Sequence, residues 1–352
     1  MNSMRMRVIS IGIIISLLTT LLTGCTDIEN DNKKEVGANS KEYERVAIIS
    51  PPILSVYLGT VPDKNRIVGV NSRAYDTANQ KVIKELFPSY DKVDTSFINK
   101  KFITNTEQLL KLDPDIVFYY GNAQKKGIEK LTIPTIDMLY NKSQDPEKIT
   151  IEWENNIMKL FNVEKENTIK KEWEKTNQRV EDILENIETK KKGLYIFSYI
   201  NGKITVSGKN TYGDNFFEMS GIENVATDIE GNKEASMEQI LQWNPEVIYI
   251  FLGMPASPII NNEVNDQDWS LIQATKDKAI YDIPQAAYSW GAPCEDSPLM
   301  PLWLIYKTYP SSLDKDEFIK EFKGYYKRIY DVELDDEIIE DVLNPKMMKK
   351  GK

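Results

Sequence analysis

Aromatic, cationic and amide side chains follow several apolar runs of this sequence, and they are the residue types best able to hold a ligand. Eight of them, together with Met254, lie where a buried strand is expected to end, or in loops nearby: Arg73, Tyr75, Tyr120, Asn122, Tyr199, Tyr212, Met254, Tyr288 and Trp290. Aromatic rings offer broad rigid surfaces, and a guanidinium can meet negative charge. This set suits a bulky, partly apolar, anionic ligand such as a metal complex. Strand alternation turns either Tyr119 or Tyr120 toward the core and leaves open which one.

The chain contains no histidine. The usual general base at neutral pH, the Ser-His-Asp and Cys-His arrangements, and the commonest ligand of zinc, copper and nickel are therefore missing. Residues 202–210 have five residues rather than four between their glycines, and residues 265–268 lack the glycine and glutamate of a calcium loop. We interpret both segments as turns. We expect no enzyme, no catalytic residue, no cofactor and no bare metal site.

The composition is that of a folded acidic protein. Hydrophobic residues make up 41% of 352 residues, and the net charge is −10. Nucleic acid binding needs clustered cationic residues, so we expect no nucleic acid partner, and the Lys-rich end at 346–352 is too short to change this. The two cysteines are Cys25 and Cys294. We expect no disulfide, and a lone Cys294 is predicted to be a small buried hydrophobe.

Residues 1–24 have the order of a secretory signal. Arg5 and Arg7 precede an apolar stretch at 8–18, and Leu22-Thr23-Gly24 leads to Cys25. The stretch is shorter than the roughly 20 residues of a spanning helix. Residues 22–25 are similar to the bacterial lipobox, and this resemblance implies acylation of Cys25 and anchoring at the outer face of the cell membrane. The alternative is an ordinary signal peptide with an incidental cysteine.

The residues after Cys25 set the elements that must position the ligand residues. Polar residues at 25–42 predict a flexible tether. Short apolar runs follow, separated by helical spacing or turn residues, at 45–50, 66–70, 115–120, 134–138, 193–198, 246–251 and 279–283. Strands that alternate with helices indicate a parallel sheet covered on both faces.

One module occurs in both halves of the chain. Residues 105–117 align without a gap onto residues 236–248, so each half is predicted to build the same helix, turn and strand. Asn105 and Ser236 are expected to cap the two helices, Ser236 in a capping box. Glu107 and Glu238 then occupy equivalent places in the first helical turns, where a carboxylate also complements the helix dipole.

A charged segment without Gly or Pro, at 166–190, separates the halves and predicts one long helix. We therefore expect an N-terminal lobe at 43–165, an interlobe helix at 166–190, a C-terminal lobe at 191–345 and a polar tail at 346–352. The alternative is a surface helix of one domain.

Taken together, the Cys25 motif, the paired N-T-E and S-M-E helix starts, the joining helix and Trp290-Gly291-Ala292-Pro293 resemble the iron-siderophore, haem and cobalamin class of ABC solute-binding proteins. The resemblance implies two Rossmann-like α/β lobes with mainly parallel sheets, joined by a long helix, with a ligand cleft between them. It also implies that Glu107 and Glu238 dock onto arginines of an ABC permease, which works with its ATPase.

The resemblance implies a monomer that captures an iron complex, with a ferric siderophore as the main expectation. A corrinoid, haem or an oxyanion such as molybdate is the alternative within this fold. Siderophore sites of the family commonly present several arginines, whereas only Arg73 is placed near the expected cleft here. A surface enzyme or adhesin is the alternative from another class, since fold does not determine function.

Overall fold

The computed structural model describes residues 42–345. The predicted signal segment, Cys25, the tether up to residue 41 and the tail at 346–352 lie outside the described residues. Within residues 42–345, no helix combines the length and the apolar character that a membrane crossing requires.

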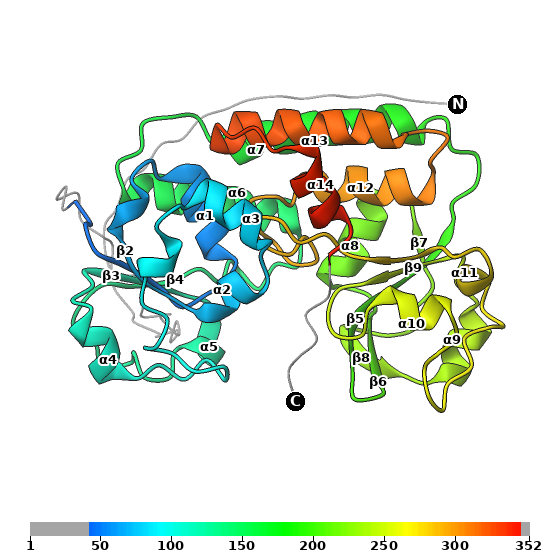
Figure 1. The fold of residues 1–352 in the computed structure, drawn as a ribbon, viewed down its shortest axis with the longest axis horizontal. Coiled ribbons are helices and arrows are strands. Elements are labelled where there is room, and N and C mark those ends of the chain that lie inside the picture. The colour runs from blue at the N-terminus through cyan, green and yellow to red at the C-terminus, as the bar shows by residue number, and fades with distance from the viewer. Residues whose placement is uncertain (1–41, 346–352) are drawn as a thin grey trace, which may run out of the picture. The chain divides into compact units, whose positions relative to one another are not determined.

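The first half of the described chain contains a four-stranded parallel sheet (Figure 1). Its strands, in the order β2-β1-β3-β4, are β1 (Val46–Ile48), β2 (Ile67–Val70), β3 (Ile116–Tyr119) and β4 (Thr135–Asp137). Val46 and Ile48 pack into one apolar core and Ala47 into another, because successive side chains point to opposite faces. Both faces are therefore covered, as the continuous apolar runs require.

Helices and short 3-10 turns connect these strands. They are α1 (Ile53–Thr60), η1 (Lys64–Arg66), α2 (Ser72–Asp76), α3 (Gln80–Leu86), η2 (Tyr90–Lys92), α4 (Thr106–Lys111), α5 (Gly121–Gln124) and α6 (Pro146–Leu160). Side-chain oxygens of Asn71, Asn79, Asn105 and Asp145 accept backbone amide hydrogens at the starts of α2, α3, α4 and α6. These caps satisfy amides that a helix leaves unpaired.

The second half contains a six-stranded sheet that is parallel on one side and antiparallel on the other. Its strands are β5 (Lys192–Ile200), β6 (Lys203–Ser207), β7 (Glu223–Asn224), β8 (Asn232–Ala235), β9 (Val247–Ile250) and β10 (Ile280–Asp282). Strands β10, β9 and β5 are parallel to one another. Strand β6 is antiparallel to β5, and β8 is antiparallel to β6. The mainly parallel α/β fold predicted from the sequence is confirmed.

The interpretation of residues 202–210 as a turn is wrong. A tight turn at Asn201 and Gly202, both with positive φ, leads into strand β6. Ile204 and Val206 are buried while Lys203 is exposed, so the segment has the alternation of a half-buried strand. This alternation, rather than the glycine spacing, is the pattern that predicts the strand.

The helices of the second half are α8 (Tyr212–Met219), α9 (Met237–Trp243), α10 (Ala256–Ile260), α11 (Gln273–Lys276) and α12 (Leu299–Thr308). The capping box predicted at Ser236 is present, with Gln239 as its partner. Asn105 caps α4 by accepting the amide hydrogen of Gln108. Each half thus builds the helix, turn and strand that the internal alignment predicts.

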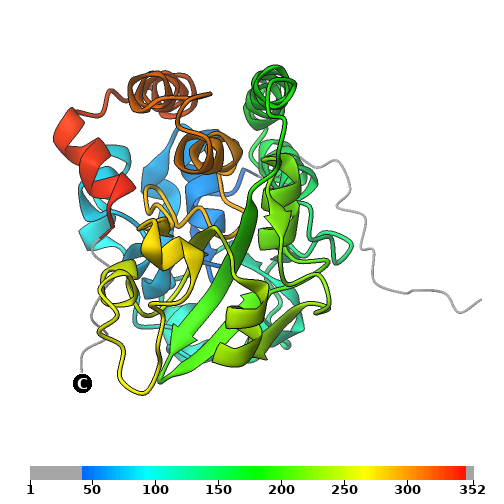
Figure 2. The ribbon, with the colours of Figure 1, turned by 90° about the vertical axis from the view of Figure 1, so that its right-hand side faces the viewer.

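Two long helices, α7 (Thr168–Leu184) and α13 (Lys315–Tyr330), run side by side and are seen nearly end-on in Figure 2. Three ion pairs join them: Glu172 to Arg328 at 2.5 Å, Lys175 to Glu321 at 2.7 Å, and Arg179 to Glu317 at 3.6 Å. The partners run in opposite sequence directions, so the helices are antiparallel. Helix α7 is shorter than the predicted 166–190, because its last turn closes at Glu185.

The last two described helices, α13 and α14 (Asp336–Leu343), contact the first half. Lys81 of α3 pairs with Glu337 and Asp341 of α14, at 2.6 and 2.7 Å. Helix α13 also packs against α1. The segment predicted as the C-terminal lobe at 191–345 therefore includes elements that lie against the first half, and α7 is one of two long helices on this side.

A buried turn precedes α12 and ties these elements together. The carboxylate of Asp296 accepts hydrogen bonds from Ala287 N at 3.0 Å, Tyr326 Oη at 3.0 Å, Tyr330 Oη at 3.1 Å and Trp290 Nε1 at 3.3 Å. Cys294 is fully buried, as predicted for a small hydrophobe. We call this feature the Asp296 network.

Candidate functional site

Two phenols from different halves meet beyond the carboxyl end of β3, the side of a parallel sheet on which α/β proteins bind ligands. The hydroxyls of Tyr120 and Tyr212 are 3.1 Å apart. Tyr120 directly follows β3, and its ring packs edge-on against Trp153 of α6. Tyr212 begins α8 and also hydrogen-bonds Gln144. Burial raises the pKa of Tyr212 well above its usual value, so this phenol stays protonated at neutral pH.

A second cluster links α2 to the loop after β10. The guanidinium of Arg73 is exposed and lies 5.1 Å from the centre of the Phe102 ring. Tyr288 hydrogen-bonds Thr77, and burial raises the pKa of Tyr288 to about 12, with Arg73 acting in the opposite direction. Asn79 N donates to Ala286 O at 2.9 Å, which fixes the loop against α3. Arg73 is thus close enough to Tyr288 to influence its pKa, and a shared ligand role for the two side chains stays a prediction.

Tyr75 packs edge-on against Tyr90, and its hydroxyl is buried without a hydrogen-bond partner among the described residues. Burial raises the pKa of Tyr75 above its ordinary value. Asn122, in α5, is exposed. Both residues lie on the elements that follow β2 and β3, so they stand near the predicted edge of the first sheet.

The prediction that Trp290 presents its indole to a ligand is wrong for this structure. Trp290 is 0% exposed, packs edge-on against Phe322 of α13 and donates to Asp296. The loop after β10 folds back beneath α13 rather than standing open between the halves. From the sequence alone, an aromatic residue in a loop after a strand can be a ligand contact or a core residue, and here it is a core residue.

Tyr199 is also misassigned, because it is 2% exposed and lies in the core of the second sheet. Strand β5 continues to Ile200, so Tyr199 remains within the strand and turns inward beside Trp269. Its hydroxyl donates to Gln267. Met254 packs against the same core, and its amide donates to Tyr199 O. Neither residue is brought to the phenol pair.

Gln144 and Thr77 contact the predicted tyrosines but were missed by the sequence analysis. Gln144 lies in the loop after β4, which ends at Asp137, and the same rule that selected the other strand ends would have found it. Thr77 is the last residue of the α2 region and carries no distinguishing pattern.

Glu107 and Glu238 are exposed in the first turns of α4 and α9. Hydrogen bonds from its own backbone amide and from Ser236 lower the pKa of Glu238, so its carboxylate is charged at neutral pH. The two glutamates thus have equivalent positions, as predicted.

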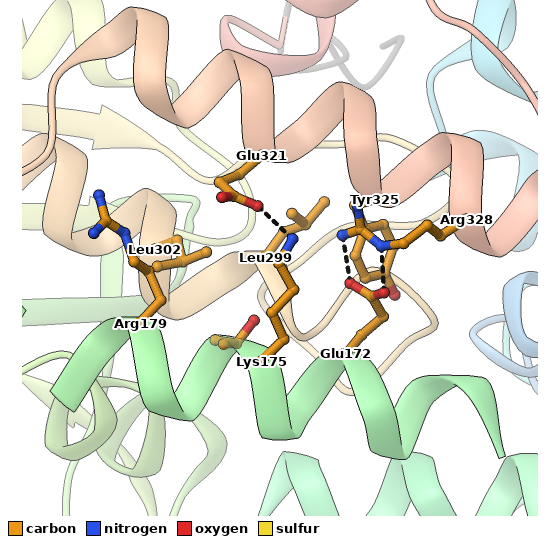
Figure 3. A pocket seen from close by; sticks show the side chains of 9 residues that line it. Glu172, Lys175, Arg179, Leu299, Leu302, Glu321, Tyr325 and Arg328 are labelled. Carbon is orange, nitrogen blue, oxygen red and sulfur yellow. Dashed lines mark hydrogen bonds and ion pairs between the residues drawn. The ribbon is translucent and has the colours of Figure 1, made fainter. Parts of the chain in front are cut away.

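A narrow crevice with a volume of about 10 Å³ lies between α7, α12 and α13 (Figure 3). Its charged residues are already paired, Glu172 with Arg328 and Lys175 with Glu321. Arg179 pairs with Glu317. We interpret it as a crevice between packed helices rather than a ligand site. Residues 42–345 contain no group of three or more Cys, Asp or Glu side chains placed to hold a metal ion.

Comparisons with known proteins agree with this architecture. The profile of the periplasmic binding protein family matches residues 64–287. The molybdate-binding protein MolA of Haemophilus influenzae is 28% identical over 260 residues, which cover 64% of this chain and 70% of MolA.

Solved structures show the same fold. A periplasmic solute binding protein from Veillonella parvula superposes with a TM-score of 0.75 at 25% identity, over 87% of this chain and 93% of that one. Molybdate-bound MolA gives 0.68 at 23% identity, over 84% and 94% of the two chains. CeuE of Helicobacter pylori, in a complex with nickel and histidine, gives 0.66 at 21% identity, over 86% and 94%. The chain belongs to the periplasmic binding protein family, and it is a solute-binding protein of an ABC transporter.

Proposed function

We propose that this protein captures an anionic, oxygen-rich metal species between its two halves and delivers it to an ABC permease and its ATPase. The observation that carries the proposal is the Tyr120–Tyr212 hydroxyl pair at 3.1 Å. It joins the loop after β3 to the start of α8, so a ligand held there contacts both halves at once.

The chemistry of the pair favours an oxyanion. A protonated phenol donates a hydrogen bond to a negatively charged oxygen, and it is a poor ligand for a bare metal ion, which needs the phenolate. Arg73, exposed beside the second tyrosine cluster, supplies positive charge. Molybdate, the solute in the name of the relative MolA, is an anion of this type.

A ferric siderophore is the second candidate, and the tyrosines themselves favour it. Tyr75, Tyr120, Tyr212 and Tyr288 remain partly buried rather than sealed in a core, and their rings offer apolar area to a bulky ligand. The burial of Trp290 removes the largest aromatic surface from this candidate. Corrinoid and haem lack a specific supporting contact among the described residues.

We place the protein at the outer face of the cell membrane through acylation of Cys25. The motif at 22–25 supports this, and so does the predicted export signal before it. A Cys25→Ser variant is expected in the soluble extracytoplasmic fraction, or retained with its signal, because its attachment point is missing. Membrane fractionation that matches the parent protein would contradict the anchor.

Glu107 and Glu238 are the proposed contacts with permease arginines. A Glu107→Arg, Glu238→Arg protein should bind its solute as the parent does but support no uptake, because cations then face cations. The matched control is Glu85→Arg with Glu164→Arg, which changes two exposed glutamates elsewhere. Normal uptake by the first variant would leave only the helix-dipole role for these two carboxylates.

A further inference from the structure

The two docking modules share a backbone plan but stand in surroundings of opposite charge. Residues 99–131, which contain α4, include six lysines and four acidic residues, a net charge of +2. Residues 230–278, which contain α9, include three lysines and eight acidic residues, a net charge of −5. Most of the difference arises in the segments around the aligned helices, and within the helices only Lys111, which aligns with Gln242, contributes to it.

The lysines of the first module form what we call the lysine patch: Lys100, Lys101, Lys111, Lys125, Lys126 and Lys130. All six are exposed. In the part of the chain that the structure describes, none of them takes part in an ion pair, whereas thirteen of the nineteen ion pairs there involve other lysines. Their charges are therefore available to a partner.

Backbone contacts hold the segments of this patch around the start of α4. Thr104 N donates to Lys126 O at 3.2 Å, and Thr106 Oγ1 donates to Gly127 O at 2.6 Å. A groove beside α4 is lined by Thr106, Leu110, Gly127, Glu129, Lys130, Leu131 and Thr132. Leu110 is 50% exposed and lies three residues after Glu107, so it shares a helix face with that carboxylate.

The second module is acidic around the equivalent helix. Glu234, on strand β8, comes just before α9 and is exposed, as is Glu238 within it. Gln273 N donates to Asn244 Oδ1 at 2.8 Å, which brings α11 and the following Asp277 next to the end of α9. Glu234 pairs with Lys203 at 3.3 Å, and Lys276 and Lys278 flank Asp277, so the surroundings of α9 are acidic in net charge but, unlike the lysine patch, partly paired.

We propose that this charge difference fixes the orientation in which the importer binds the protein. The importer surface that meets residues 99–131 has carboxylates around the arginine that meets Glu107, with an apolar side chain that covers Leu110. The surface that meets residues 230–278 is rich in cations. In the reversed orientation, like charges would face each other at both modules, which is unfavourable at an interface. The inference rests on the docking role proposed for Glu107 and Glu238.

The test compares two proteins with the same change in net charge. In the first, Lys100, Lys101, Lys125 and Lys126 become Glu; in the control, Lys84, Lys92, Lys159 and Lys320 become Glu. All eight lysines are exposed and unpaired among the described residues, so both variants should fold as the parent does. Association with the ABC importer in lipid nanodiscs is then measured at low and high salt.

The patch variant should associate about tenfold more slowly than the parent at low salt, with the difference shrinking at high salt, and the control should stay within about twofold. Equal rates for the two variants would overturn the inference. So would an equal loss on importer-free nanodiscs of anionic lipid, which would make the membrane the partner. If Glu107→Arg, Glu238→Arg also associates like the parent, the docking proposal itself fails. If the patch variant associates like the parent but the Glu107→Arg, Glu238→Arg protein does not, the docking proposal stands and the inference about orientation fails.

Discussion

We call the region formed by α7, α13 and the buried turn at Asp296 the helical side. There, three ion pairs join α7 to α13 and Asp296 accepts four hydrogen bonds. We call the region around the phenol pair the loop side. There, one hydrogen bond joins the hydroxyls of Tyr120 and Tyr212. Both regions join segments that are far apart in the sequence. In the first region the Asp296 network is buried and has four hydrogen bonds, while the ion pairs beside it are partly exposed. The second region is partly exposed and is joined by one hydrogen bond.

This difference separates stability from binding. A buried carboxylate with four donors cannot be removed without leaving those donors unsatisfied, which is costly in a dry interior. A single phenol pair near the surface can open for a solute at little cost, since one neutral hydrogen bond contributes about 1 kcal/mol net. We expect substitutions on the helical side to unfold the protein and substitutions on the loop side to change binding.

The largest effect is expected for Asp296→Ala. The indole of Trp290 and two phenols would lose their acceptor in a buried site, and the amide of Ala287 would keep only Tyr326 Oη. The free energy of unfolding should therefore fall by about 3 to 5 kcal/mol. Urea denaturation measures this change. Asp228→Ala, at an exposed position, is the control and should cost less than about 0.5 kcal/mol. If Asp296→Ala lowers the free energy of unfolding by less than about 1 kcal/mol, the Asp296 network is not the main source of stability on the helical side.

A smaller effect concerns pH. Burial raises the pKa of Asp296 to about 6 despite the four donors, which act in the opposite direction. An aspartate in the unfolded chain has a pKa of about 3.9, so the folded state binds the proton more tightly. The stability that this proton contributes is present below about pH 4 and is lost as the pH rises through about 6.

Asp296→Asn cannot titrate, and it isolates this contribution from that of every other group. The free energy of unfolding of the parent, minus that of the Asn variant, should fall by roughly 2 to 3 kcal/mol between pH 4 and pH 7. A difference that is flat across this range, or that rises, would show that the buried carboxylate is not held in its protonated form.

Much of the fold was predictable because its signals are local. Apolar runs such as 115–120 and 246–251 became β3 and β9, and the caps at Asn105 and Ser236 formed as the residue types predict. The loop contents were less predictable. Trp290 and Tyr288 are two residues apart in one loop, yet one is sealed beneath α13 and the other reaches Thr77.

Long-range packing decides such cases, and no period or motif in the sequence records it. The four donors of Asp296 come from positions between nine residues before it and 34 residues after it. Three of them are aromatic side chains, a residue type that suits a core position and a binding position equally, and one of the three, Trp290, was predicted to bind the ligand. The same limit hid the length of β5, which carried Tyr199 into the core rather than to a loop.

The most direct test of the central claim is isothermal titration calorimetry of the parent, Tyr120→Phe and Tyr212→Phe with sodium molybdate and with a ferric siderophore. We predict saturable binding of the anion by the parent, about tenfold weaker binding by each Phe variant, and free energies of unfolding within about 1 kcal/mol of the parent. Binding of the siderophore alone, with the same tyrosine dependence, would select the second candidate. Absence of binding to either probe, or Phe variants that bind as tightly as the parent, would contradict capture at the phenol pair.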